Sequence, residues 1–205
     1  MNIVWYGHAC FCVDSQGYRI VLDPYDGVRG YPPLQLQAQQ VLCSHEHFDH
    51  HHLAAVTLCP ASSSPFSVET VSTFHDDRGG ALRGSNTVHI LRAEGLTVVH
   101  LGDLGHLLSD AQAQPLTGCD VLLIPVGGTY TIDGELAYET VRQLRPRIAV
   151  PMHYRRGAFG FDNVDTAEPF LSHFPAQQLH RLSGSGFDPR TAPDGVVLPA
   201  YPAAE

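Results

Sequence analysis

Four side chains that commonly bind metal ions lie within one short segment, residues 44–50. The segment reads Ser-His-Glu-His-Phe-Asp-His, and its candidate ligands are His45, His47, Asp49 and His50. His45 and His47 are two positions apart, so on an extended backbone they point in the same direction. Asp49 and His50 follow where the chain can turn and direct both side chains to a second point. Imidazole and carboxylate ligands without a thiolate predict Zn, Mn or Fe in an open, reactive site.

Two other interpretations of this segment fit less well. The histidine run from His50 to His52 could chelate metal loosely, but the ordered spacing follows a predicted buried strand at residues 41–43. A zincin site needs H-E-x-x-H on one helix, and Asp49 stands where the second histidine would be. His51 and His52 are therefore expected to be solvent-facing or structural.

Candidate partners for these ligands lie at the ends of predicted strands. His75, Asp103 and His153 each close an apolar strand, where the backbone leaves the core and binding residues concentrate. Four further histidines are expected to be structural or at the surface: His89, His100, His173 and His180. For His106 two roles stay open, because it either orients a ligand or moves protons at the site, or it caps the next helix.

The rest of the pattern predicts the elements that position these residues. Residues 2–23 are predicted to form an antiparallel meander of three strands, with His8 in the tight turn between the first two. Later strands are predicted at 66–74, 87–92, 96–101, 120–126 and 148–150, and helices from Ser109 onward, at 135–144 and at 166–174. Antiparallel strands followed by strand–helix alternation predict an α/β domain with helices outside.

Three segments are predicted to lack regular structure. Residues 26–40 and 78–86 are expected to be loops, and the sequence leaves open whether they close over the site as lids. The segment from about Pro189, rich in proline and alanine, is expected to cover the surface.

The composition limits the class of protein. The 205 residues fit a single domain, 1–205, and 43% of them are hydrophobic. No apolar run approaches the roughly 20 residues that span a membrane, and no basic signal-peptide region is visible, so a cytoplasmic protein is expected. The odd cysteine count of five argues against disulfides. The net charge of -9 argues against a broad nucleic-acid-binding surface.

All 12 basic residues are arginine, and this excludes several mechanisms. Without lysine there is no P-loop lysine, no Schiff-base lysine and no S-x-x-K hydrolase site. The G-x-S-x-G motif of serine hydrolases is absent as well. A water activated by metal ions needs no side-chain nucleophile, which agrees with these absences.

The motif and its partners resemble the metallo-β-lactamase fold superfamily of metal-dependent hydrolases. The resemblance extends from residues 5–9, Trp-Tyr-Gly-His-Ala, to residues 151–154, Pro-Met-His-Tyr, and is closest to small bacterial hydrolases with an N-terminal W-x-G-H-A segment. It implies an α/β fold of the four-layer αββα sandwich type. It also implies a ligand set, in which one metal is bound by His45, His47 and His75, the other by Asp49, His50 and His153, and Asp103 bridges the two.

The function implied by this resemblance is that of a dinuclear metal-dependent hydrolase. Two divalent metal ions, with Zn expected and Mn or Fe as alternatives, would share a bridging hydroxide that cleaves an ester, lactone or phosphodiester bond of a small molecule. Asp49 and Asp103 would hold this hydroxide. His8 is expected at the rim of the site as a third catalytic residue that binds substrate or orients a ligand, or else it is a turn residue with its ring in solvent. The family leaves the substrate open.

Substrate contacts are predicted at Tyr130, Tyr154 and Arg155. Arg156 is the next residue, and Arg78 and Arg83 follow the candidate ligand at position 75. Because arginine suits phosphate and carboxylate groups, these side chains predict an anionic substrate if they face the site, and are ordinary surface charges otherwise. Two other functions stay open, a di-iron oxidoreductase of the same fold and a non-catalytic metal-binding protein. The sequence does not decide the native metal or whether the chain forms homo-oligomers.

Overall fold

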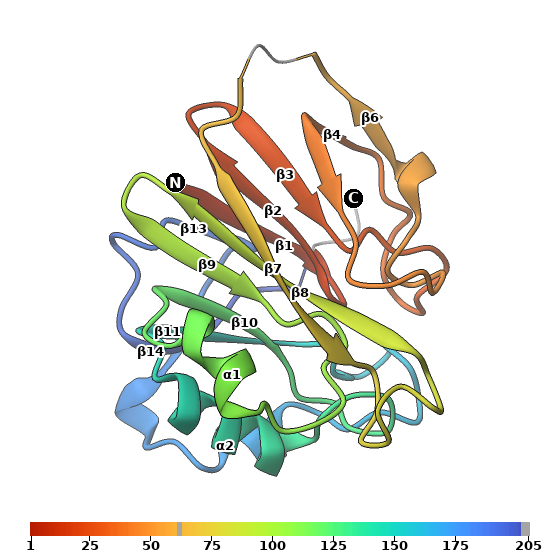
Figure 1. Cartoon of the computed structure of the whole chain (residues 1–205), viewed down its shortest axis with the longest axis vertical. Coiled ribbons are helices and arrows are strands. Elements are labelled where there is room, and N and C mark those ends of the chain that lie inside the picture. Colours follow the sequence, from red (N-terminus) through yellow and green to blue (C-terminus); the bar gives the residue numbers. More distant parts are fainter. Residues whose placement is uncertain (61–62, 202–205) are drawn as a thin grey trace.

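The predicted N-terminal meander forms most of the first of two large sheets. In the computed structural model, which describes residues 1–60 and 63–201, strands β1 (Asn2–Gly7), β2 (Cys10–Ser15) and β3 (Tyr18–Leu22) pair antiparallel in sequence order (Figure 1). β5 (Gln40–Leu42) pairs parallel with β3, and β13 (Gly186–Phe187) pairs antiparallel with β1. The sheet therefore has the order β13-β1-β2-β3-β5.

The second sheet has seven strands in the order β12-β14-β11-β10-β9-β8-β7. Their bounds are β7 Ser67–Phe74, β8 Ser85–Ala93, β9 Leu96–His100, β10 Val121–Pro125, β11 Ile148–Met152, β12 Leu179–Arg181 and β14 Gly195–Leu198. β7, β8 and β9 pair antiparallel, and the pairs from β9 to β12 are parallel. Every residue of β10 and β11 is buried, as expected for strands covered on both faces.

Alternation along the first sheet explains how the two sheets pack. Successive side chains of a strand point to opposite faces of the sheet, so every second residue faces the same side. On one face, the main core shared with the second sheet includes Ile3, Trp5, Phe11 and Val13. Cys10 and Cys12 point to the other face, where they meet a second apolar cluster. The first sheet is therefore apolar on both faces.

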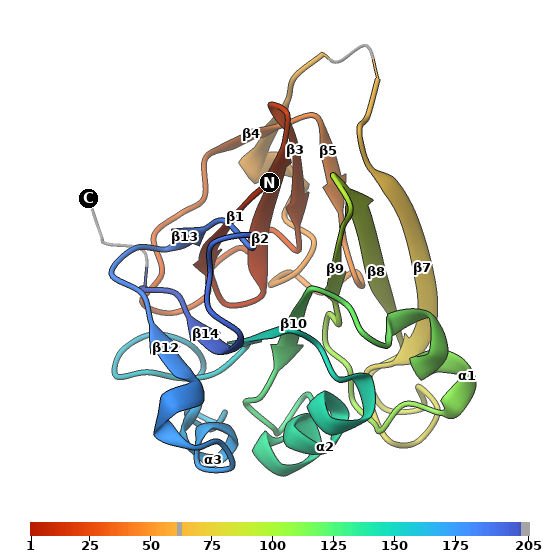
Figure 2. The same ribbon diagram turned by 90° about the vertical axis from the view of Figure 1, so that its left-hand side faces the viewer.

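The two outer layers differ from each other. Helices α1 (Asp110–Ala113), α2 (Gly134–Leu144) and α3 (Glu168–Leu171) all lie on the outer side of the second sheet (Figure 2). The outer side of the first sheet is covered by residues 25–34 and by the two-stranded sheet of β4 (Leu36–Ala38) and β6 (Val56–Leu58). Within residues 1–60 and 63–201 this second outer layer contains no α-helix. The α/β sandwich is confirmed, with helices concentrated on one side.

Local sequence signals explain where the helices begin and end. Ser109 forms the predicted capping box with Gln112 at the start of α1. Asp133 caps the start of α2, and Arg145 in a left-handed conformation caps its end. The helix predicted at 166–174 is only the four residues of α3. None of the helices among the described residues has the length and apolar character needed to cross a membrane.

The C-terminal prediction was wrong in one respect. The segment expected to cover the surface includes β14, which lies between β11 and β12 in the second sheet. Val196 and Val197 of β14 are fully buried. The run Gly-Val-Val-Leu is too short to be recognised by periodicity, but its β-branched residues are typical of a buried parallel strand. Residues 202–205 of the predicted tail lie outside the described part of the chain.

Candidate metal centre

The predicted ligands follow strands whose carboxyl ends reach the same end of the sandwich. β9, β10 and β11 are parallel, and β7 runs parallel to β9 because both pair antiparallel with β8. His75 directly follows β7, Asp103 follows β9 and His153 directly follows β11. The segment 44–50 follows β5 of the facing sheet. Side chains from both sheets therefore meet where strands end, as is typical of binding sites in α/β proteins.

Two groups of side chains meet around Asp103. The ligand atoms of His45, His47 and His75 lie within 4.8 Å of one another, and so do those of His8, Asp49, His50 and His153. The Asp103 Oδ2 atom lies 3.2 Å from Nε2 of His50, 3.3 Å from Nε2 of His75 and of His153, and 4.0 Å from Nε2 of His45. The structure thus brings together all seven predicted ligands, while their role as ligands stays a prediction.

Neighbouring groups orient the histidine rings. Three rings have a partner at Nδ1: His45 at Ser44 Oγ (2.9 Å), His50 at Asp23 Oδ2 (2.8 Å) and His75 at the Tyr130 carbonyl oxygen (3.0 Å). Metal-binding histidines are usually fixed in this way by a bond at the other ring nitrogen. The Nε2 atoms of all three rings are thereby directed toward Asp103.

Several buried polar atoms in the cluster have no hydrogen-bond partner within the described residues. They are Nε2 of His45, Nε2 of His50, both ring nitrogens of His153 and Oδ1 of Asp103. A buried polar atom without a partner costs free energy, so such a concentration needs an explanation. Bound divalent cations would satisfy most of these atoms, including one nitrogen of the His153 ring, because imidazole nitrogen and carboxylate oxygen are ordinary Zn ligands. The residues present therefore fit a metal centre.

The charges of the cluster favour a cation at its centre. The carboxylates of Asp103 and Asp23 raise the pKa of His50 well above its usual value, although burial opposes this. Burial also opposes ionisation of Asp103, yet the neighbouring His153 and His50 lower its pKa well below the usual range. Positive charge between these carboxylates is therefore stabilised, which a metal site requires.

Asp23 is a part of the site that the sequence did not reveal. It directly follows β3 and is fully buried, and it accepts hydrogen bonds from Ser44 N (2.7 Å), Ser44 Oγ (2.6 Å) and the His50 ring. Burial raises its pKa, but the charges of His100 and His50 outweigh this effect and keep the carboxyl ionised. The signal that could have identified it is the one used for Asp103, a carboxylate at the end of a buried strand.

The predicted rim residue His8 lies inside the second group of side chains. It occupies the turn between β1 and β2, is 2% exposed, and has Nε2 at 3.2 Å from Asp49 Oδ2. Burial is the main reason why its pKa is lowered to about 4, so the ring is neutral at neutral pH. Its carbonyl oxygen accepts hydrogen bonds from Trp5 Nε1 (3.0 Å) and from the His153 backbone (3.3 Å). The turn is thereby fixed to both sheets.

Backbone strain is concentrated at the cluster. Seven described non-glycine residues have positive φ, and four of them lie here: His8, Asp23, Thr129 and His153. Residues with a Cβ atom rarely adopt this region of φ, and holding a strained residue there costs about 1–3 kcal/mol of free energy. The surrounding contacts hold these residues in a strained backbone, as occurs at many functional sites.

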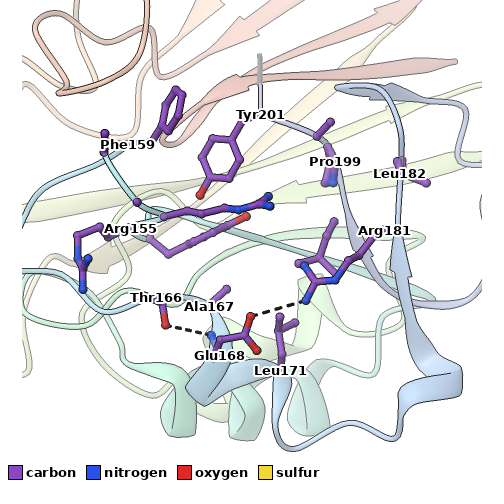
Figure 3. Close-up of a pocket in the computed structure, with 16 residues that line it drawn as sticks. Arg155, Phe159, Thr166, Ala167, Glu168, Leu171, Arg181, Leu182, Pro199 and Tyr201 are labelled. Atoms are coloured by element: carbon purple, nitrogen blue, oxygen red, sulfur yellow. Dashed lines mark hydrogen bonds and ion pairs between the residues drawn. The ribbon is translucent and has the colours of Figure 1, made fainter. Parts of the chain in front are cut away.

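The three predicted substrate contacts are divided between two hollows of the surface. Tyr130 lines a cavity of about 580 Å³ above the cluster, here called the metal-facing cavity. Tyr154 and Arg155 line a separate pocket of about 830 Å³, which shares no residue with that cavity (Figure 3). Tyr154 stacks on Trp5 there, and Arg155 Nε donates to the Val164 carbonyl oxygen (3.3 Å). The structure therefore does not bring these two residues to the cluster.

Other histidines have the structural roles expected of them. His89 Nε2 bonds to the Cys43 carbonyl oxygen (3.1 Å), and His100 Nε2 bonds to the Ala9 carbonyl oxygen (2.9 Å). His106 accepts a hydrogen bond from the Phe74 backbone at 3.1 Å. Because Phe74 directly precedes His75, His106 supports the strand end that delivers a predicted ligand.

Known proteins are similar to this chain in both sequence and fold. A family model described as "Beta-lactamase superfamily domain" matches residues 2–153. A UPF0173 protein of Pyrococcus abyssi is 31% identical over 183 residues, covering 78% of this chain and 85% of the relative. A UPF0173 metal-dependent hydrolase of Thermoplasma acidophilum is 26% identical over 187 residues, covering 75% and 83%. A crystal structure of a proposed Zn-dependent hydrolase of the metallo-β-lactamase superfamily from Thermotoga maritima has a TM-score of 0.74 and 34% identity, covering 97% of this chain and 98% of that one.

Proposed function

The chain belongs to the β-lactamase superfamily and is a metal-dependent hydrolase of the metallo-β-lactamase fold, and on this premise we propose that it uses two divalent metal ions to hydrolyse an ester, lactone or phosphodiester bond of a small molecule. One observation above all supports two ions. The Asp103 carboxylate lies between two groups of ligand atoms, within 3.2–4.0 Å of ring nitrogens from both. A single buried carboxylate in this position is suited to contact both ions.

Each ion is assigned its own group of side chains. His45, His47 and His75 would hold one ion, and Asp49, His50 and His153 would hold the other. Zn is the metal we propose first, because nitrogen and carboxylate ligands with room for a further ligand are typical of catalytic Zn sites. Bound in this way, two divalent ions would supply an activated water at neutral pH and would polarise the oxygen of the scissile bond.

Two carboxylates of the chain would position the attacking water. Burial opposes ionisation of Asp49, but the hydrogen bond from His8 and the charge of His50 lower its pKa below the usual range. Asp49 and Asp103 are therefore both carboxylates at neutral pH and can accept hydrogen bonds from the attacking water. Asp49, whose Oδ2 lies 3.2 Å from His8 Nε2 and is held in place by this contact, would orient the attacking water.

The test is metal content combined with turnover. Elemental analysis of untagged protein should find about two metal ions per chain, and a panel of aryl esters, lactones and bis-aryl phosphodiesters should identify the bond that is cleaved. Asp103→Asn should lose metal and activity. Asp120→Asn is the matched control, because Asp120 accepts the Thr97 backbone N–H (2.8 Å) at the opposite end of the same sheet.

Two results would contradict the proposal. One metal ion or fewer per chain, together with no turnover of the panel, would mean that the two groups of side chains do not act as a dinuclear hydrolytic site. Iron in the purified protein, with a visible absorption band and no hydrolysis, would instead favour an oxidoreductase of the same fold.

A further inference from the structure

The metal-facing cavity contains residues that the hydrolytic step does not use. Besides predicted metal ligands it is lined by three aromatic rings, by Arg83 and by Glu46. Its volume of about 580 Å³ lies within the range of small-molecule sites, roughly 300–1,000 Å³. Such residues beside a reactive centre determine which molecules can bind with their scissile bond at the predicted metal ions.

The aromatic residues form one connected surface centred on Phe161. Its ring centroid lies 6.4 Å from that of Phe48 and 6.2 Å from that of Tyr130, in both cases edge-on, and 5.4 Å from that of His8. Phe48 is 61% exposed, and among the large apolar side chains of the described residues only Leu58 is more exposed. An exposed ring between two predicted metal ligands does not stabilise the core, so its apolar face is available to a bound molecule.

Arg83 is fixed at the edge of this surface. Its guanidinium lies over the Tyr130 ring, 5.6 Å from the centroid, and Nη2 donates to the Thr129 carbonyl oxygen at 3.0 Å. Arg83 forms no ion pair with any residue in 1–60 or 63–201. A guanidinium has five N–H donors, so most of them are left to bind an acidic group in the cavity.

The loop that includes Arg83 is held rigidly by Asp76. The Asp76 carboxylate accepts four backbone hydrogen bonds of 2.8–2.9 Å, from the N–H groups of Arg78, Gly80, Leu82 and Arg83. Because Asp76 directly follows the predicted ligand His75, the loop and the metal centre share one anchor. Arg83 is therefore positioned in advance, as a specificity residue should be.

We propose that the substrate contains a flat aromatic ring with an acidic oxyanion, such as a carboxylate, and that the bond to be cleaved joins this ring to the rest of the molecule. The ring lies against Phe161, between Phe48 and Tyr130, and the acidic group binds Arg83. Glu46, the other charged residue at the cavity that is not a predicted ligand, repels a second acidic group. This inference rests on the proposed function, because the metal centre must bind the reacting end of the same molecule.

Non-hydrolysable phosphonates test the inference without turnover. Isothermal titration calorimetry of the metal-loaded protein would compare methylphosphonate, phenylphosphonate, and 3- and 4-carboxyphenylphosphonate. The phosphonate group binds the metal centre in every case, so the differences measure the ring and the acid separately. We expect phenylphosphonate to bind on the order of tenfold more tightly than methylphosphonate, as stacking of one ring on aromatic side chains supplies. At least one carboxylated isomer should bind several-fold more tightly still.

Two pairs of variants assign these gains to residues. Phe161→Leu keeps an apolar side chain but should reduce the phenyl preference to within about twofold. Phe159→Leu is its control, because Phe159 is also partly buried but lines the separate pocket of Figure 3. Arg83→Gln should abolish the carboxylate preference, whereas Arg78→Gln, an exposed arginine of the same loop, should leave it unchanged.

The outcomes separate this inference from the proposed function. Tight methylphosphonate binding without a gain from the phenyl ring would overturn the inference and leave the dinuclear centre in place. A phenyl gain that persists in Phe161→Leu would also overturn it. A protein that neither holds metal nor binds any of the phosphonates would overturn both.

Discussion

Replacing Asp23 with asparagine tests whether Asp23 orients the predicted ligand His50. One Asp23 oxygen accepts from Ser44 N, and the other accepts from Ser44 Oγ and from His50 Nδ1. In Asp23→Asn, one of these oxygens becomes an NH₂ group, which can only donate. If the NH₂ group faces His50, Nδ1 must accept a hydrogen bond, and the ring proton then moves to Nε2, the atom directed at the cluster.

The size of the effect follows from these contacts. Mutation of residues that orient metal-binding histidines typically lowers metal affinity about 10- to 100-fold. Each factor of ten corresponds to about 1.4 kcal/mol. Because His50 belongs to the group with Asp49 and His153, the ion held by that group should be lost first. Loss of a buried acceptor should also lower the free energy of unfolding of the metal-free protein by about 1–3 kcal/mol.

The assay is competition with a fluorescent Zn chelator, combined with elemental analysis after dialysis. Wild type should retain about two ions per chain, and Asp23→Asn about one. Asp14→Asn is the matched control, because Asp14 lies in the same sheet and accepts the Gly17 backbone N–H (3.0 Å) away from the cluster. Two ions bound by Asp23→Asn with wild-type affinity would refute the assignment of Asp23 as the residue that orients His50.

Two further substitutions test the backbone around the site. In Gly127→Ala the new Cβ atom would lie 2.1 Å from the carbonyl oxygen of His153. Because such overpacking typically destabilises the folded state by about 1–3 kcal/mol, we expect a lower Tm and a lower metal content. A Tm and a metal content equal to those of wild type would contradict the close approach. Asp76→Asn should lower Tm at neutral pH, because four backbone N–H groups lower the pKa of Asp76 to about 2 although burial opposes this. The stability that a lowered pKa provides is complete above the usual value of 3.8 and is lost as the pH falls through about 2, so the Tm difference between wild type and Asp76→Asn should shrink over that interval. A difference that stays constant down to pH 2 would contradict this account.

The convergence of the seven predicted ligands could be predicted because each of them has a local signal. Residues 44–50 combine ligand types at a spacing that fixes their directions. His75 and His153 directly follow strands, and Asp103 lies just beyond one. The carboxyl ends of strands that run in the same direction within one sheet lie at the same edge of the sheet, whatever the loops between them do. The sequence therefore indicated which side chains converge without specifying the layers around them.

Residues that depend on tertiary contacts could not be predicted in the same way. Tyr154 and Arg155 follow His153 in sequence, but successive side chains point in different directions, and Tyr154 packs on Trp5. Phe161 lies in a loop and lines the metal-facing cavity, and the residues next to it in the sequence do not indicate this position. In the sequence, Arg83 is one of several arginines near a predicted ligand, and nothing distinguishes it from the others. Its position depends on the hydrogen bonds that hold its loop to Asp76.

Both large sheets contain strands that are translated late, and this has a consequence for protein synthesis. β12, β13 and β14 are translated after every predicted ligand, yet β14 flanks β11, which delivers His153, and β13 flanks β1, next to the turn that contains His8. A chain still emerging from the ribosome thus has two unpaired strand edges beside its future metal centre. Pairings between segments so distant in sequence form late. We therefore expect the predicted centre to become a defined binding site only after β13 and β14 have paired, and chains that lack these strands to expose edges that favour aggregation.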